Sequence, residues 1–182
     1  CGDATGHGTA SGMMVSIIKS ALNGLPALST NNVLYELNNI VKKIDLGTLK
    51  MSLNICEANK NKITLSSAAM PPVYLYNSIS KKTEEILIRG LPLGGLKNET
   101  FDIQKRDFKK GDVLVMLSDG LPEAENSNGE LYDYDRVLSL ITKNSKRSSE
   151  EIRDKLISEV DRWLDGGIPD DDVTIVVIKK NT

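Results

Sequence analysis

The sequence is poor in the two residue types that most often hold zinc or build a disulfide scaffold. Its 182 residues include two cysteines, Cys1 and Cys56, and one histidine, His7. Two cysteines form neither a disulfide framework nor a metal-binding quartet, and a single histidine argues against the usual zinc sites. Cys56 lies in a strand-like run, so we expect it to be a buried thiol.

Several other features are missing. No apolar run approaches the ~20 residues that a membrane span needs, and no leader-like segment opens the chain, which together favour a cytoplasmic setting. The net charge is −2 and the basic residues are scattered, which argues against a nucleic-acid surface. Neither a phosphate-binding Gly-x-x-x-x-Gly-Lys loop nor a Gly-x-Ser-x-Gly elbow occurs.

The composition that remains is that of an ordinary globular protein. Hydrophobic residues make up 40% of the chain and charged residues 26%, and the length predicts a single domain over 1–182. The chain begins Cys1-Gly2-Asp3 without a methionine. We therefore expect it to be an N-terminally truncated fragment of a longer protein.

Hydrophobic periodicity predicts segregated helices and strands. Apolar residues recur at helical spacing over 14–25, 30–44, 137–141 and 152–164, and the Ser148-x-x-Glu151 capping box opens the last of these four helices. Period-two patterns fill 49–107, and β-branched runs occupy 113–117 and 173–178. This order indicates an α+β fold with helix pairs packed on antiparallel sheets.

Three acidic residues lie where elements are expected to end. Asp119 follows the apolar run 113–117, Asp3 lies in a glycine-rich turn, and Asp171 precedes the last strand. Carboxylates brought together would repel each other unless a cation neutralised them, and oxygen ligands suit Mg²⁺ or Mn²⁺. The alternative is that each one is an ordinary turn or capping residue. His7 is read as a structural histidine, with a catalytic or ligating role as the alternative.

The motifs in order resemble a known family. They are Gly2-Asp3-Ala4-Thr5-Gly6-His7-Gly8, Gly90-Leu91-Pro92-Leu93-Gly94, Ser118-Asp119-Gly120-Leu121-x-Glu123-Ala124, Asn128-Gly129-Glu130-x-Tyr132 and Asp171-Asp172-x-Thr174. This series resembles the metal-dependent serine/threonine phosphatases of the protein phosphatase 2C (PPM) superfamily, and within it the bacterial SpoIIE-like branch that regulates sigma factors.

The resemblance implies both a fold and a site. The fold would be an α-β-β-α sandwich of two antiparallel sheets flanked by helix pairs, lacking one or more N-terminal strands here. Two Mn²⁺ or Mg²⁺ ions would be held by Asp3 as the bridging carboxylate, the Ala4 carbonyl, Asp119, Asp171 and Asp172. Water activated by these ions would hydrolyse phosphoserine or phosphothreonine, with Asp3, Asp119 and Asp171 as the catalytic residues.

The chain departs from the family pattern at one motif, and the resemblance also implies interaction partners. An earlier acidic motif that helps to hold the second metal in the superfamily is absent, so this chain is expected to bind one ion better than the other. The implied substrate is a phosphorylated anti-sigma-factor antagonist, and an N-terminal sensory or receiver module is expected in the full-length protein. A homodimer is left open. The alternative function is a catalytically inactive phosphatase-like domain that binds a partner or scaffolds a complex.

Overall fold

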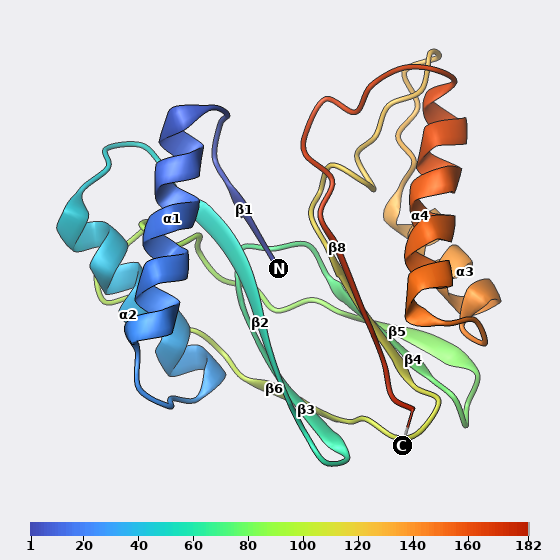
Figure 1. The fold of residues 1–182 in the computed structure, drawn as a ribbon, viewed down its shortest axis with the longest axis horizontal. Coiled ribbons are helices and arrows are strands. Elements are labelled where there is room, and N and C mark those ends of the chain that lie inside the picture. Colours follow the sequence, from blue (N-terminus) through green and yellow to red (C-terminus); the bar gives the residue numbers. More distant parts are fainter. Residues whose placement is uncertain (182) are drawn as a thin grey trace. The chain divides into compact units, whose positions relative to one another are not determined.

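A computed structural model describes residues 1–181, and the chain divides into two compact units. The α1–α2 unit comprises residues 2–70 and 88–107, and the α3–α4 unit comprises residues 71–87 and 108–181 together with Cys1. Each unit contains one antiparallel four-stranded sheet and one pair of helices (Figure 1). The α+β prediction with helix pairs on antiparallel sheets is therefore confirmed, whereas the single domain over 1–182 stays a prediction.

The α1–α2 unit has the strand order β1-β2-β3-β6. Its elements are β1 (Gly2–Ala4), α1 (Thr9–Gly24), α2 (Thr30–Ile44), β2 (Met51–Asn59), β3 (Lys62–Ala68) and β6 (Gln104–Asp107). Its core joins buried residues of the two helices, such as Met14 and Leu37, to Leu53 and Ala68 of the sheet. The apolar stripes that predicted the two helices are therefore the faces that pack on the strands.

A buried asparagine ties the 91–96 loop of this unit to α2. The side chain of Asn38 is fully buried. It accepts a hydrogen bond from the Gly94 amide at 2.9 Å and donates to the Leu96 carbonyl at 2.8 Å. Gly94 has φ +82°, and a Cβ there would lie 2.7 Å from Val41 Cγ1. Both the backbone conformation and the close packing therefore favour glycine at this motif position.

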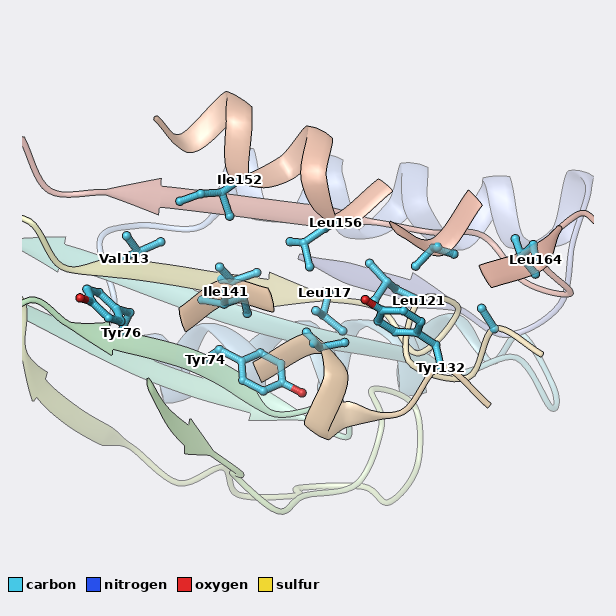
Figure 2. Close-up of a cluster of buried hydrophobic side chains, with 14 residues drawn as sticks. Tyr74, Tyr76, Val113, Leu117, Leu121, Tyr132, Ile141, Ile152, Leu156 and Leu164 are labelled. Atoms are coloured by element: carbon cyan, nitrogen blue, oxygen red, sulfur yellow. The ribbon is translucent and has the colours of Figure 1, made fainter. Parts of the chain in front are cut away.

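The α3–α4 unit has the strand order β5-β4-β7-β8. Its elements are β4 (Val73–Asn77), β5 (Lys82–Ile86), β7 (Val113–Leu117), α3 (Tyr134–Asn144), α4 (Ser149–Leu164) and β8 (Ile175–Lys179). All five residues of β7 are buried, as the uninterrupted apolar run predicted. Figure 2 shows Val113 and Leu117 of this strand in one cluster with Ile141 of α3 and Leu156 of α4.

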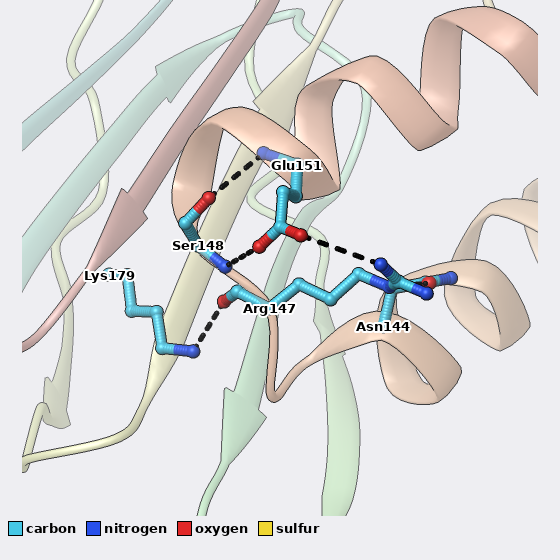
Figure 3. A network of polar contacts seen from close by, with 5 residues as sticks. All are labelled: Asn144, Arg147, Ser148, Glu151 and Lys179. Atoms are coloured by element: carbon cyan, nitrogen blue, oxygen red, sulfur yellow. Dashed lines mark hydrogen bonds and ion pairs between the residues drawn. The ribbon is translucent and has the colours of Figure 1, made fainter.

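The predicted capping box starts α4. Ser148 Oγ accepts from the Glu151 amide at 3.1 Å, and the Glu151 carboxylate accepts from the Ser148 amide at 2.9 Å (Figure 3). These two bonds satisfy amides that a helix start leaves without intrahelical partners. The hydrogen bond from the Ser148 amide is the largest cause that lowers the pKa of Glu151, and the Arg147 guanidinium adds to it.

Four local predictions were wrong or shifted. Asp3 lies in a strand, opposite Ser52 of β2, and not in a turn. The period-two pattern predicted across 49–107 is interrupted at two places, because β5 (Lys82–Ile86) ends at Ile86 and residues 101–103 precede β6 instead of forming it. Cys56 is only partly buried in β2, although burial is the main cause that raises its thiol pKa to about 11.

No helix among residues 1–181 is both long and apolar enough to cross a bilayer.

Candidate metal centre

Asp119 is held at the end of the most buried strand of the α3–α4 unit. β7 ends at Leu117, and the two residues that follow are Ser118, which is fully buried, and Asp119, which is partly buried. Leu117 and Leu121 both point into the core cluster on either side of it (Figure 2). The Asp119 carbonyl accepts from the Glu123 amide at 2.9 Å, which closes the turn after the strand. The predicted place of Asp119 at the mouth of a core strand is therefore confirmed.

The buried Ser118 side chain fastens this strand end to the segment that carries Asp171. Its Oγ donates to the Asp172 carbonyl at 2.9 Å and accepts from the Thr174 amide at 2.9 Å. The Ser118 amide also donates to the Thr174 carbonyl at 3.0 Å, which extends the β7–β8 pairing. Three hydrogen bonds thus hold the two segments in one register.

Gly120 lets the two segments approach closely. A Cβ built at this position would lie 2.7 Å from the Asp172 carbonyl oxygen and 3.0 Å from the Asp171 carbonyl oxygen. Both distances involve backbone atoms, which cannot move aside as a flexible side chain can. A glycine is therefore required for the segments to lie this close, and the closeness sets the positions of Asp119 and Asp171.

The Asp119 and Asp171 carboxylates come together as a result. Each supplies an oxygen, and these two oxygens lie within 4.8 Å of each other. Divalent cations bind oxygens at about 2.0–2.6 Å, so two ligands of one ion lie at most roughly 4–5 Å apart. Asp171 is exposed and Asp119 partly buried, so the pair combines a fixed carboxylate with one that is open to solvent.

Asp119 also has an acceptor atom that the protein does not satisfy. Its Oδ1 is buried and has no hydrogen-bond partner among the described residues. A buried carboxylate oxygen without a donor costs free energy unless a cation or another partner compensates it. Asp119 Oδ1 lies next to a second carboxylate, so the ligand atoms of this pair are all oxygens. Such a set fits a hard divalent cation such as Mg²⁺ or Mn²⁺.

The remaining predicted ligands are placed as follows. Asp172 is exposed, and its carbonyl accepts the hydrogen bond from Ser118 Oγ. Its carboxylate does not lie with the Asp119 and Asp171 carboxylates. Asp3 and Ala4 belong to the α1–α2 unit. Ala4 packs against the core of that unit, and because strand side chains alternate, Asp3 points to the opposite face of the sheet. His7 is exposed and makes no hydrogen bond within 1–181.

Two polar residues near Asp119 were not predicted. The Tyr134 hydroxyl donates to Glu123 at 3.5 Å. Burial, together with the negative charges of Glu123 and Asp119, raises the pKa of Tyr134 to about 12, so the phenol stays protonated at neutral pH. Ser118 was missed as well, although a small hydroxyl between an apolar run and Asp-Gly is the signal that could have identified it.

The family model for Stage II sporulation protein E (SpoIIE) matches residues 1–181. The chain belongs to the SpoIIE family. Among curated proteins it is 26% identical to phosphoserine phosphatase RsbU of Bacillus subtilis, over 98% of this chain and 54% of RsbU. It is 25% identical to Stage II sporulation protein E of Bacillus subtilis, over 92% of this chain and 19% of that protein. The SpoIIE-family chain thus spans about half of the first of these relatives and less of the second.

Solved structures show the same fold for this SpoIIE-family chain. The SiaA-PP2C domain of Pseudomonas aeruginosa superposes with a TM-score of 0.79 at 16% identity, over 99% of this chain and 73% of that one. The PP2C phosphatase domain of SpoIIE from Bacillus subtilis, with a fragment of its regulatory domain, gives 0.71 at 20% identity, over 98% and 52%. The catalytic domain of the phosphatase PstP in complex with two manganese ions gives 0.69 at 18% identity, over 97% and 84%. The predicted PP2C fold and SpoIIE-like branch are confirmed.

Proposed function

We propose that this chain is a metal-dependent phosphatase domain that hydrolyses phosphoserine or phosphothreonine in proteins. The observation that carries the proposal is the buried, unpartnered Asp119 Oδ1 beside the Asp171 carboxylate. Membership of the SpoIIE family and the similarity to RsbU, which is named as a phosphoserine phosphatase, support the reaction class. A PP2C-fold relative that holds two manganese ions supports the choice of Mn²⁺ or Mg²⁺.

The proposed ligands follow from the site and from the motifs. Asp119 and Asp171 would hold one ion, and the family resemblance assigns Asp3, the Ala4 carbonyl and Asp172 as further residues that would hold metal. When bound, such ions neutralise charge on the phosphoryl group and make water more acidic. Ser118 and Gly120 keep the two carboxylates close together. Hydrolysis joins the water oxygen to phosphorus and breaks the ester bond, and the serine or threonine hydroxyl leaves with a proton.

The experiment compares two aspartate variants of neighbouring segments. Asp119→Asn removes a ligand charge, whereas Asp170→Asn makes the same chemical change beside Asp171 at an exposed residue outside the proposed ligand set. Release of phosphate from a phosphoserine peptide is measured with and without Mn²⁺, and Mn²⁺ binding is measured by calorimetry. Asp119→Asn is expected to lower the rate by about a hundredfold or more, because a lost ligand weakens both metal binding and charge stabilisation.

The two measurements distinguish an active phosphatase from an inactive phosphatase-like module. Equal rates for Asp119→Asn and the wild type would refute the assignment of Asp119. Mn²⁺ binding without any hydrolysis would instead support the alternative, a catalytically inactive phosphatase-like module that binds a partner. Asp170→Asn should leave both measurements unchanged.

The substrate and the regulation are proposed on coarser support. We place the substrate among phosphorylated anti-sigma-factor antagonists, which follows from the family resemblance. A structure of SpoIIE joins its PP2C domain to a fragment of a regulatory domain, and the chain spans 54% of RsbU. Both observations support a sensory or receiver module in the full-length protein. A cytoplasmic setting and a homodimer remain predictions.

A further inference from the structure

A groove of about 820 Å³ lies between α3 and α4. It belongs wholly to the α3–α4 unit, and residues of both helices line it together with Tyr132. Figure 3 shows the turn between the two helices, where Arg147 reaches Glu151 and Asn144. The catalytic proposal uses none of these residues.

Positive charge dominates the lining. Five basic side chains face two acidic ones, Asp135 and Glu159, although the whole chain carries a net charge of −2. The basic residues are Arg136, Lys143, Arg147, Lys155 and Arg162. Arg147 and Arg162 are paired with glutamates. The Lys143 and Lys155 ammonium groups have no hydrogen-bond or ion-pair partner within residues 1–181, so they can bind an incoming anion.

The tryptophan of the groove is held by hydrogen bonds, and an arginine side chain lies over its ring. Trp163 Nε1 donates to the Ala124 and Glu130 carbonyls at 3.1 and 3.2 Å, and the ring meets Tyr132 edge-on with centroids 5.8 Å apart. The Arg136 guanidinium lies 4.3 Å over the Trp163 ring. This contact restricts the Arg136 side chain, and the N–H groups of a guanidinium are the donors with which arginine binds carboxylates.

The spacing of the cations indicates what they bind. Arg136 and Lys143 on α3 are seven residues apart, as are Lys155 and Arg162 on α4, which places each pair about 10 Å apart along its helix. A chain in the extended polyproline II conformation rises about 3.1 Å per residue with three residues per turn, so every third side chain lies on the same side, about 9 Å farther along. A single phosphate could reach only one level of the groove, and a lipid surface is flat. We propose that the α3–α4 groove binds an extended acidic segment of a partner protein, with carboxylates about three residues apart.

Trp163 is the only tryptophan in the chain, so its fluorescence reports on binding in the groove. Its fluorescence is recorded while a synthetic peptide is added that has ten or so residues, Asp or Glu at every third position, and no aromatic residue. A control peptide carries Asn and Gln instead. The acidic peptide should change the emission saturably and the neutral one should not. About 0.5 M NaCl should weaken binding strongly, since it shortens the Debye length to roughly 4–5 Å.

Two matched variants locate the contact. Lys143→Glu/Lys155→Glu reverses the unpaired cations, and Lys19→Glu/Lys105→Glu makes the same change in net charge at exposed residues of α1 and β6. The groove variant should lose at least about tenfold in peptide affinity, while the control keeps wild-type affinity and both keep the wild-type melting temperature.

Three results of the peptide assay would overturn the proposal. They are no saturable response to the acidic peptide, equal losses in the two variants, or displacement of the peptide by inorganic phosphate at equimolar concentration. Binding of anionic phospholipid vesicles that depends on Lys143 and Lys155, in place of peptide binding, would assign the groove to a membrane surface and would also overturn it. Phosphatase activity is not part of the readout, so the result is independent of the proposed function.

Discussion

Replacing Ser118 by alanine tests how the candidate metal centre is held together. The change removes one buried hydroxyl and, with it, the hydrogen bonds to the Asp172 carbonyl and from the Thr174 amide. Each hydrogen bond contributes about 1 kcal/mol net, and a buried amide left without a partner adds to the loss. We expect unfolding to become easier by about 2 kcal/mol, which corresponds to a melting temperature about 4–8 °C lower.

The same variant should bind Mn²⁺ more weakly. Ser118 touches no proposed ligand oxygen, but it holds the segment that carries Asp171 against the end of β7. Residues that orient metal ligands in this way typically change affinity by about 10–100-fold when mutated. We expect a tenfold or larger loss, measured by calorimetry well below the melting temperature so that only folded protein is compared.

Ser145→Ala is the matched control. Ser145 is also a buried serine of the α3–α4 unit, and its hydroxyl donates only to the Thr142 carbonyl within the end of α3. It should cost about 1 kcal/mol and leave Mn²⁺ affinity unchanged. Unchanged Mn²⁺ affinity in Ser118→Ala would refute the positioning role, and unchanged stability would refute the hydrogen-bond reasoning.

Two further predictions concern stability. Asp112 is buried, and its carboxylate accepts from the Ser78 and Lys109 amides at 2.7 Å each; Asp112→Ala should therefore cost about 2–3 kcal/mol in urea unfolding, and a loss below 0.5 kcal/mol would contradict this. The lowered pKa of Glu151 means that its stabilisation is present above the unfolded pKa and disappears as pH falls through the folded pKa. Glu151→Gln should thus be less stable than wild type at pH 7 and equal to it near pH 2, and a gap that persists in acid would show that the charge is not responsible.

The sequence predicted best what depends on local patterns. Five consecutive apolar residues identified β7, and the box formed by Ser148 and Glu151 identified the start of α4. Both signals lie within a few residues of sequence. An uninterrupted apolar run indicates a buried strand, and a Ser-x-x-Glu pattern indicates a helix cap. The acidic residue after β7 could be singled out for the same reason, because a run that ends in Asp-Gly leaves the carboxylate at the strand end.

Edge elements were harder to predict. β1 has three residues, and Asp3 is paired there because Ser52 of β2 lies opposite it, which glycine-rich local sequence does not reveal. The Ser52 hydroxyl also donates to the Asp3 carbonyl at 3.3 Å. β6 is similarly set by its pairing to β3 and consists of one polar residue followed by three charged ones. Where a strand is specified by its partner, composition favours a loop.

The pairing of Asp119 with Asp171 could be proposed from their places at element ends and from the family resemblance, but local sequence could not establish it, because what creates it is long-range. Ser118 and Asp172 are 54 positions apart, and the close approach at Gly120 is between backbones. Two carboxylate charges 4–5 Å apart repel by roughly 1–4 kcal/mol at effective dielectric constants between water and a protein surface. The hydrogen bonds of Ser118 are of the same size. The scaffold can therefore hold both charges close while the Asp119 oxygen has no donor, and a divalent cation there would turn the repulsion into attraction.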